Sequence, residues 1–451
     1  MLSNDSILRK KDTLIIFTYA IAGFGHLRVT DALYHEVETS SNNVFLNTGS
    51  KVITLFHNMI SIHPVARAIF EWAQNGKVED AFTYLFRIFL KFESNKLLKR
   101  FITVLDYSKK PLKTVIVVAT HFFLAHQITQ IKQELEKRAN IKLFLIVQVT
   151  DDSPQHIWYV PGADLTFSPS EYTKKRLLEY GRKAGFDPIK IIVAPYPVSE
   201  TLTMKLMDKK YKYKLSQFDP NNDQPINIMV PISGASVGLD YFTKMSEILS
   251  KQSKKINLHI LLKKTPYTQI FINKLKKQES VNLKAYKKDT KIIDVYENQY
   301  KKFTFGYEIT KPSEQAFKSL IGIENVGGPV LLFTNPIGRQ EYDNLNFLKK
   351  HNLIPSIEDQ KLIWNSYDRS LGVSINLLKK ASSWRGIRLF KDPEKSVNFF
   401  LWCLKNNIFR EMGKYKLNLE MEDSYKKEVG SNGVNKFWEE VEEHIKNKGK
   451  T

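Results

Sequence analysis

The first candidate for chemistry is a glycine-rich turn near the N-terminus that ends in a histidine. Gly23–His26 reads Gly-Phe-Gly-His and follows an apolar run. Glycines let backbone amides approach a ligand, and a helix that starts at such a turn favours negative charge at its N-terminus. A neutral imidazole there could act as a general base; the simpler alternative is a histidine that caps a turn. The turn lacks both the third glycine of a dinucleotide-binding motif and the Gly-Lys-Ser/Thr of a phosphate-binding loop.

A second polar segment also comes directly after an apolar run. It contains Asp151 and Asp152, and His156 and Trp158 follow a few residues later. A carboxylate and an imidazole on one loop could orient a hydroxyl group or tune a base. Together with His121 they could instead bind a metal, although no spacing enforces this, and an aspartate that caps a helix is the structural alternative.

The third polar segment lies in the C-terminal half. Glu314, with Lys311 and Ser313 just before it, precedes an apolar strand, and Gln340 and Glu341 follow that strand. A glutamate at a helix start can bind both hydroxyls of a ribose, and an amide and a carboxylate side by side can do the same for a hexose. The structural alternatives are a carboxylate that meets the helix dipole and a solvated first helical turn.

Short apolar strands that alternate with helical patterns must position these residues. Continuous apolar strands between helices indicate a parallel sheet covered on both faces, and such sheets bind ligands at the carboxyl ends of their strands. Both His26 and Asp151 follow predicted strands, as this placement requires. The strands predicted in the N-terminal half are 14–19, 115–119, 143–149 and 191–193.

A second series of strands begins after a polar stretch that is rich in Lys, Asp, Asn and Tyr. Ile226–Val230 leads into Ser233–Gly238, a second turn that contains glycines, and further strands are predicted at 258–262 and 329–333. We therefore expect an α/β protein built from two domains. The predicted parts are an N-terminal domain over 1–204, a linker over 205–225, a C-terminal domain over 226–411 and a charged helical tail over 412–451.

The composition predicts a large intracellular protein. The 451 residues include 42% hydrophobic and 12% aromatic side chains, which suffices for a substantial core. The single cysteine, Cys403, excludes a disulfide scaffold and a cysteine-based zinc site. No apolar run reaches the roughly 18 to 20 residues that span a bilayer, and the N-terminal residues lack the pattern of a signal peptide.

Positive charge coincides with aromatic residues in one segment. Lys and Arg number 68 against 47 Asp and Glu, a formal net charge of +21. Such an excess favours nucleic acid, an anionic membrane surface or a nucleotide as partner, although a lysine-rich composition alone also produces it. Residues 82–113 are basic, so this segment could lie in lipid headgroups or pack as an ordinary surface helix. Its apolar residues at helical spacing are Phe82, Leu85, Phe86, Phe89 and Leu90.

Taken in order, these segments resemble the family 28 glycosyltransferases of GT-B fold. Within that family they are most similar to monogalactosyldiacylglycerol synthases and processive diacylglycerol glycosyltransferases. The resemblance covers roughly residues 14 to 350. The matching segments are the turn Gly23–His26, the Thr-Asp…His…Trp segment Thr150–Trp158, Pro169–Glu171, Pro195–Ser199, and the donor-side segments Thr310–Glu314 and Gly338–Asn344.

The resemblance implies two Rossmann-like domains that face each other across a cleft. It implies an inverting transfer of a hexose from a UDP-sugar to a lipid acceptor, most simply diacylglycerol, by a peripheral protein at the cytoplasmic face of a membrane. His26 would remove the acceptor proton, with Asp151 as second candidate or partner. Gly25, His156 and Trp158 would lie near the acceptor. The residues expected to bind the donor are Gly234, Lys311, Ser313, Glu314, Gln340, Glu341 and Asn344.

The donor half departs from the family pattern in two places. Pro312 and Ser313 stand where the family has two or three glycines whose amides hold the diphosphate, so we expect Gly234 and Lys311 to contribute there. An apparent insertion, Ile323–Gly328, precedes the next strand. We expect no cofactor and no metal, since no obvious Asp-x-Asp motif is present and a helix N-terminus with Lys or Arg can stabilise a leaving diphosphate.

Three alternatives remain beside this hypothesis. A glycosyltransferase of the same fold that acts on a polyprenyl-linked or other acceptor would keep every motif. A UDP-sugar epimerase of the same fold would need no membrane surface. A basic nucleic-acid-binding protein, from a different class, would explain the net charge of +21 but not the ordered motifs.

Overall fold

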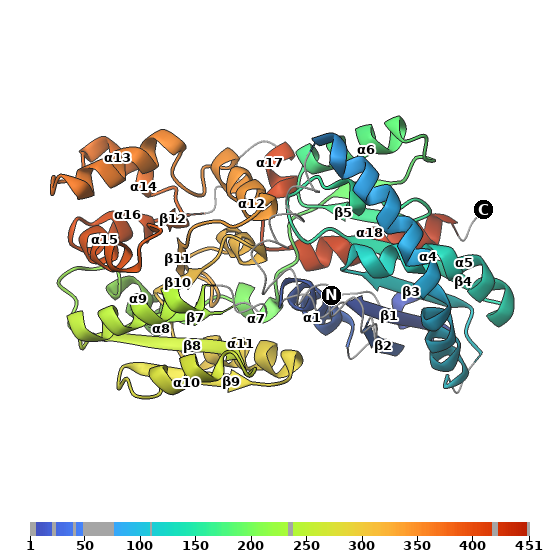
Figure 1. The fold of residues 1–451 in the computed structure, drawn as a ribbon, viewed down its shortest axis with the longest axis horizontal. Coiled ribbons are helices and arrows are strands. Elements are labelled where there is room, and N and C mark those ends of the chain that lie inside the picture. The colour runs from blue at the N-terminus through green and yellow to red at the C-terminus, as the bar shows by residue number, and fades with distance from the viewer. Residues whose placement is uncertain are drawn as a thin grey trace. The chain divides into compact units, whose positions relative to one another are not determined.

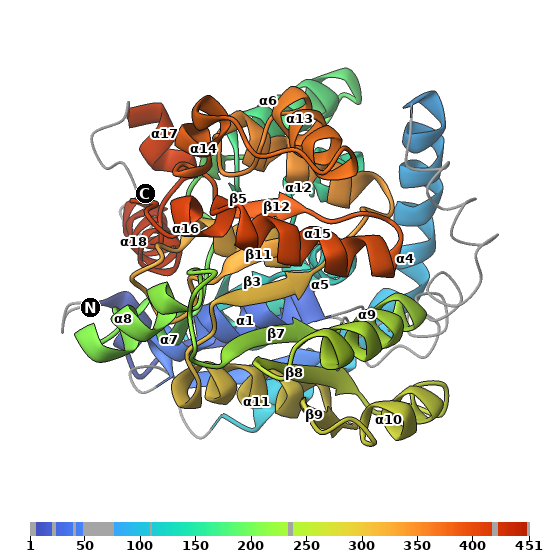
Figure 2. The same cartoon turned by 90° about the vertical axis from the view of Figure 1, so that its left-hand side faces the viewer.

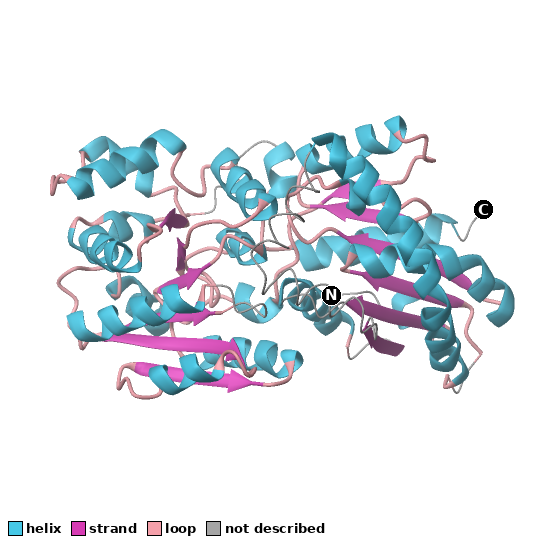
Figure 3. Cartoon of the chain, viewed as in Figure 1, coloured by secondary structure: helices cyan, strands magenta, loops and turns pink. Residues whose placement is uncertain are grey.

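The computed structural model describes residues 6–19, 24–38, 42–47, 76–108, 111–232, 238–416 and 423–448. The chain forms two compact α/β units (Figure 1). Unit 1 comprises Met1–Ser199 and Glu422–Thr451, and unit 2 comprises Glu200–Met421. The described part of each unit contains a parallel sheet of six strands, and helices cover the sheets (Figure 3). Two Rossmann-like α/β units are therefore confirmed.

The sheet of unit 1 has the strand order β2-β1-β3-β4-β5-β6. The chain adds β2 on one side of β1 and then crosses to β3 on the other side, so the topological switch point lies between β1 and β3. Central strands are almost wholly buried, which explains their continuous apolar sequences. The strands are β1 Thr13–Tyr19, β2 Asn42–Asn47, β3 Thr114–Ala119, β4 Lys142–Gln148, β5 Leu165–Ser168 and β6 Ile191–Val193.

The C-terminal segment returns to unit 1, where the red helix α18 lies among the blue and green elements in Figure 1. Trp438 Nε1 donates to Leu33 O over 3.0 Å, and the Phe437 ring lies 4.4 Å from that of Phe167. Both aromatic residues are buried. The helices of unit 1 are η1 Ile7–Arg9, α1 Phe24–Val37, α4 Gly76–Asp106, α5 Phe122–Ala139, η2 His156–Trp158, α6 Glu171–Lys183, α17 Asp423–Glu428 and α18 Gly433–Lys448.

The sheet of unit 2 has the order β12-β11-β10-β7-β8-β9 (Figure 2). Its switch point lies between β7 and β10, since the chain extends to β9 on one side before β10 pairs on the other. The strands are β7 Ile226–Pro231, β8 Ile256–Lys263, β9 Val281–Tyr286, β10 Tyr307–Thr310, β11 Val330–Phe333 and β12 Gly386–Arg388. The helices are α7 Glu200–Thr203, α8 Asp208–Ser216, α9 Leu239–Gln252, α10 Gln269–Leu275, α11 Asp289–Lys302, η3 Glu314–Leu320, α12 Arg339–Lys350, α13 Ile357–Asp368, α14 Ile375–Ala381, α15 Pro393–Lys405 and α16 Ile408–Met412.

The stretch expected to be a linker and the apparent insertion pack on each other inside unit 2. Residues 205–225 include α8, whose buried Lys214 donates from Nζ to Ile323 O over 3.2 Å and to Asn325 O over 2.6 Å. The buried Arg385 donates to the carbonyls of Ile321 and Pro329, each over 3.0 Å. Two buried basic side chains thus hold the inserted loop and the residues that flank it through backbone carbonyl oxygens. Burial lowers the pKa of Lys214 well below its usual value and that of Arg385 to about 10.

Within the described residues, no helix is both long and apolar enough to cross a membrane.

Candidate functional site

His26 lies in the first turn of α1, which begins beyond the carboxyl end of β1. Its Nδ1 is 2.7 Å from Thr120 O and 3.2 Å from Thr150 Oγ1. A carbonyl oxygen can only accept, so Nδ1 carries the proton of the neutral ring. The lone pair of that tautomer is therefore on Nε2. This is the protonation state that a general base requires.

Buried hydroxyl groups hold the start of α1 against the end of β3. Thr30 Oγ1 donates to His26 O over 2.7 Å and lies 2.7 Å from Thr120 Oγ1, which is also within 3.1 Å of His26 O. Thr30 and Thr120 are both fully buried. The His26 backbone and ring are thus fixed to the neighbouring strand, which limits the freedom of the imidazole.

His121 lies directly beside His26, because β1 and β3 are neighbours at the switch point. The two ring centroids are 4.5 Å apart, with the planes at 67°. His121 is fully buried and caps α5, since its Nδ1 accepts from Phe123 N over 3.2 Å. Sequence reasoning had placed His121 only in a possible metal site. Its position directly after a predicted strand was a sequence signal that it lies at the same sheet edge as His26.

Trp158 completes an aromatic group around His26. Its ring centroid lies 6.4 Å from that of His26 and 5.3 Å from that of Phe122, which meets it edge-on. Phe122 in turn stacks on His121 at 4.5 Å. The structure therefore brings together His26 and Trp158, both predicted from the sequence, and adds His121 and Phe122. Gly25 precedes His26 in the same partly exposed turn.

The other residues of the second polar segment have separate surroundings. Asp152 is buried and its Oδ1 accepts from Thr173 Oγ1 over 2.7 Å and from Ser170 Oγ, which ties the loop to α6. Asp151 is partly exposed, and its role stays a prediction. Asp152 is thus a structural anchor.

His156 points toward α4 and α6. Its ring stacks on Tyr180 with centroids 4.0 Å apart, and its Nδ1 is 2.7 Å from Asp80 Oδ1. Together with Arg87 these residues line a cavity of about 490 Å³. An acceptor-binding role for His156 would therefore use this cavity. Among the described residues no group of three or more His, Cys, Asp and Glu side chains comes together to hold a metal ion, so the alternative site of His121, Asp151 and His156 is not assembled.

The donor-side residues follow β10 and β11, on the side of β7 where the switch point lies. Lys311 Nζ is 3.3 Å from Glu341 Oε1, and both side chains are 12% exposed. Glu341 Oε2 also accepts from Ile337 N over 2.6 Å. Burial raises the pKa of the Glu341 carboxyl, and the nearby Lys311 opposes this rise. Lys311 and Glu341 thus form a largely buried ion pair at the start of α12.

Asn344 holds the turn that follows Lys311. It is fully buried, and its Nδ2 donates to Pro312 O over 3.2 Å, which fixes the turn between Lys311 and Glu314. Asn344 therefore contacts the loop that was predicted to bind the donor. Its hydrogen bond is a positioning role that the sequence did not indicate.

The other predicted donor residues lie around the same turn. Ser313 precedes the 3-10 helix η3, and Glu314, its first residue, accepts from Gln315 Nε2 over 3.0 Å. Gln340 is partly exposed in the first turn of α12, which begins after Gly338 at φ 78°. Gly234 lies outside the described residues. The donor roles of Ser313, Glu314, Gln340 and Gly234 stay predictions.

The apolar residues predicted over 82–113 lie on two sides of helix α4, one buried and one exposed. Leu90 is buried and Phe86 packs edge-on against Phe123 at 4.9 Å, so this side faces unit 1. Leu85 and Phe89 are 64% and 41% exposed. The exposed face of α4 comprises Tyr84, Leu85, Ile88 and Phe89.

One basic residue of this segment is used inside the unit. Arg87 donates to Tyr180 Oη over 2.9 Å and to Tyr159 O over 2.7 Å, and burial lowers its pKa. Lys96 and Lys99, farther along α4, are exposed. Arg87 is therefore not part of an exposed basic surface, and the membrane-docking role of the segment stays a prediction.

No family model matches the sequence, and no curated protein sequence matches it. Solved structures do match in fold. The chain is similar to the UDP-GlcNAc 2-epimerase of Neisseria meningitidis bound to UDP-GlcNAc, with a TM-score of 0.50 and 11% identity. This match covers 95% of the present chain and 99% of the epimerase chain. The likeness to MurG of Acinetobacter baumannii covers 96% and 99% of the two chains, with a TM-score of 0.45 and 10% identity.

The likeness to the epimerase, together with the two parallel sheets, shows the class of fold. The chain has the two-domain Rossmann-like α/β architecture of the GT-B fold.

Proposed function

We propose that this protein is a UDP-sugar-dependent glycosyltransferase that transfers a hexose, with inversion, to the hydroxyl group of a lipid acceptor. The observation that carries the proposal is the imidazole of His26 at the switch point of unit 1. Thr120 O holds it in the tautomer whose Nε2 can accept a proton. The fold supports a sugar nucleotide as donor, because an epimerase that binds UDP-GlcNAc shares it.

In the proposed reaction, the acceptor oxygen attacks the anomeric carbon while the bond from that carbon to the UDP oxygen breaks. His26 Nε2 takes the proton of the attacking hydroxyl, and Asp151 is the second candidate for this role. Positive charge on Lys311 and the N-terminus of α12 would stabilise the leaving diphosphate. No metal ion is needed for these steps as we propose them.

The donor would be bound by residues that follow β10 and β11. Glu314 would accept hydrogen bonds from the ribose, and Gln340 and Glu341 from the hexose. The ion pair between Lys311 and Glu341 suits a binding site, because each side chain can exchange its present partner for a group of the donor. When the diphosphate approaches Lys311, the Glu341 carboxylate loses part of its counter-charge and gains hydroxyl donors from the sugar.

Diacylglycerol is the proposed acceptor, reached from the cytoplasmic face of a membrane. The exposed apolar residues of α4 support this, since Leu85 and Phe89 form a surface that water solvates poorly. Lys96 and Lys99 on the same helix would each add about 1 kcal/mol of attraction to anionic lipid. Arg87 takes no part, because it is bonded inside the unit.

The test is UDP release from a panel of UDP-hexoses in the presence of anionic vesicles with and without diacylglycerol. We compare wild type with His26→Ala and with His35→Ala, a matched control on the same helix whose side chain is 46% exposed. Release that needs diacylglycerol, persists in His35→Ala and is lost in His26→Ala supports the proposal. If UDP binds but turnover occurs only with a polyprenyl-linked sugar, the acceptor is that lipid and not diacylglycerol. If UDP does not bind at all, the assignment of a UDP-sugar as donor is wrong.

A UDP-sugar epimerase is the second candidate, favoured by the likeness to the Neisseria meningitidis enzyme. We incubate the protein with UDP-GlcNAc in the absence of any acceptor and follow the anomeric protons by NMR. A new sugar nucleotide that accumulates without UDP release would favour the epimerase over transfer to a lipid.

A further inference from the structure

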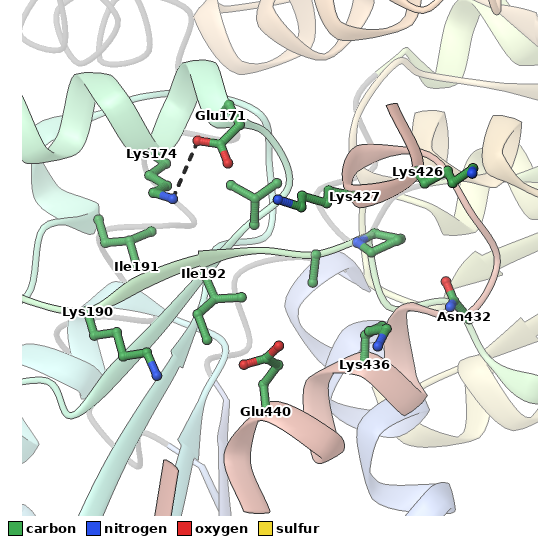
Figure 4. Close-up of a pocket in the computed structure, with 13 residues that line it drawn as sticks. Glu171, Lys174, Lys190, Ile191, Ile192, Lys426, Lys427, Asn432, Lys436 and Glu440 are labelled. Carbon is green, nitrogen blue, oxygen red and sulfur yellow. Dashed lines mark ion pairs between the residues drawn. The ribbon is translucent and has the colours of Figure 1, made fainter. Parts of the chain in front are cut away.

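A groove outside the candidate site runs along the edge of the unit 1 sheet. It has a volume of about 680 Å³ and borders β6, which is the last strand in the order of that sheet. Helix α6 forms one wall, and the C-terminal helices α17 and α18 form the other (Figure 4). All of its lining residues belong to unit 1. The volume is within the range of about 300 to 1,000 Å³ that small-molecule sites occupy.

The rim of the groove is strongly basic. Five lysines and two glutamates line it, which leaves an excess of three positive charges. In Figure 4 the lysines surround the groove from opposite sides rather than converge on one point. The lining lysines are Lys174 on α6, Lys190 before β6, Lys426 and Lys427 on α17, and Lys436 on α18.

Two of these lysines take part in weak surface ion pairs. Lys174 Nζ lies 3.5 Å from Glu171, and Lys436 Nζ lies 2.8 Å from Glu439. Exposed pairs of this kind contribute roughly 0 to 1 kcal/mol, so a multiply charged ligand can displace the carboxylates. Lys174 on α6 and Lys436 on α18 would then contact the same anionic ligand from opposite sides of the groove.

The floor of the groove is apolar and is formed by β6 and the residues that follow it. Ile192, Val193, Ala194 and Pro195 line it. Lys190 O accepts from Thr166 N and Ala194 N donates to Ser168 O, so the even-numbered residues bond to β5. Since successive residues of a strand point to opposite edges, the N–H and C=O groups of Val193 and its neighbour Ile191 point away from β5. A flat, partly apolar group with a donor and an acceptor would fit against them.

We propose that this groove binds a soluble small molecule that carries two or more phosphate groups on a partly apolar body, the chemistry of a nucleoside di- or triphosphate. Several phosphates are needed because the amines are spread along the groove, and an apolar body would cover the partly exposed Ile192 on its floor. The ligand would join α6 and β6 to the C-terminal helices α17 and α18. It would thereby stabilise unit 1 in the folded state.

The test uses ATP as the probe in the absence of UDP, because UDP is itself a nucleoside diphosphate and would compete for the groove. Binding of ATP at a donor site in unit 2 would be left unchanged by substitutions in the groove. Binding is measured by calorimetry and by the rise in melting temperature. The groove variant is Lys174→Ala/Lys436→Ala. Its matched control, Lys175→Ala/Lys446→Ala, removes the same charge from the same two helices at positions outside the groove lining. We expect ATP to bind wild type and the control equally and to bind the groove variant at least tenfold more weakly.

The proposal is overturned if ATP does not bind wild type, or if it binds the groove variant as tightly as wild type. It is also overturned if both double variants weaken ATP binding equally, since the effect would then be one of general charge. Binding of vesicles that contain phosphorylated lipid, lost in the groove variant while soluble ATP does not bind at all, would also overturn it. The melting temperatures of both variants without ATP report whether they fold, so a loss of binding is not confused with unfolding. None of these outcomes uses UDP or a UDP-sugar, so they do not depend on the proposed transferase activity.

Discussion

Each unit places a candidate residue beside the switch point of its parallel sheet, but the two units hold these residues by different means. In unit 1, His26 is held by a backbone carbonyl, Thr120 O, at the switch point between β1 and β3. In unit 2, Lys311 after β10 is held by the side chain of Glu341. A carbonyl is a fixed partner that sets a tautomer, whereas a carboxylate is a partner that an incoming anion can replace. The first arrangement suits a base and the second suits a ligand-binding group.

If this contrast is correct, His26→Ala has the largest effect and acts on turnover. Loss of a general base lowers kcat about 10²- to 10⁴-fold, while the KM for the UDP-sugar should change little, because His26 belongs to unit 1. Initial rates of UDP release over a range of donor concentrations measure both constants. An unchanged kcat with a raised KM would mean that His26 binds substrate and is not the base.

Buried histidines predict a second effect that both units should share. Burial lowers the pKa of His126 in unit 1 to about 3 and that of His259 in unit 2 to about 4. Below about pH 6.5 these histidines bind a proton in the unfolded chain but stay neutral in the folded chain. The free energy of unfolding is therefore highest above that pH and decreases as the pH falls. Each histidine should make the protein about 2 kcal/mol less stable at pH 5 than at pH 8.

Denaturant unfolding between pH 8 and pH 5 measures this loss for wild type, His126→Leu and His259→Leu. The quantity compared is the slope of the free energy of unfolding against pH, because each substitution also changes the stability at every pH. Each variant should show a shallower slope than wild type. Equal slopes in all three proteins would mean that the two rings are protonated in the folded state.

Glu341→Gln should have a smaller effect, of the opposite kinetic type to that of His26→Ala. Glutamine keeps the shape and an acceptor for the sugar hydroxyls but removes the charge that faces Lys311. We expect the KM for the UDP-sugar to rise about tenfold with kcat within a few-fold of wild type, as for an interaction made equally in the ground state and the transition state. A large fall in kcat at constant KM would place Glu341 in the chemical step.

The sequence predicted both sheets because buried parallel strands leave continuous apolar runs, as in 115–119 and 143–149. It did not predict β2, β5, β9, β10 or β12, which are short or carry polar residues. His26 could be found because it follows the first strand. The sequence also places His121 directly after a strand, but only the strand order puts the end of β3 beside the end of β1 and so brings His121 to His26.

Buried charge was the other feature that the sequence could not show. Lys214 in the predicted linker and Arg385 far along the chain look like ordinary surface cations in a lysine-rich sequence. Only the fold reveals that carbonyls of the insertion 323–328 and of the residues that flank it point toward these two side chains. The same holds for Arg87, whose partners on Tyr159 and Tyr180 are remote in sequence.

The smallest and sharpest test separates the two roles of His121. His121→Asn keeps an acceptor that can cap α5 but removes the ring beside His26, whereas His121→Phe keeps a ring and loses the cap. An edge-on ring pair contributes about 0.5 to 1.5 kcal/mol, so His121→Asn should lower kcat about threefold to tenfold. His121→Phe should mainly lower the free energy of unfolding, by about 1 kcal/mol. If His121→Asn instead abolishes turnover as fully as His26→Ala, the two imidazoles act as one catalytic unit, and the base cannot be assigned to His26 alone.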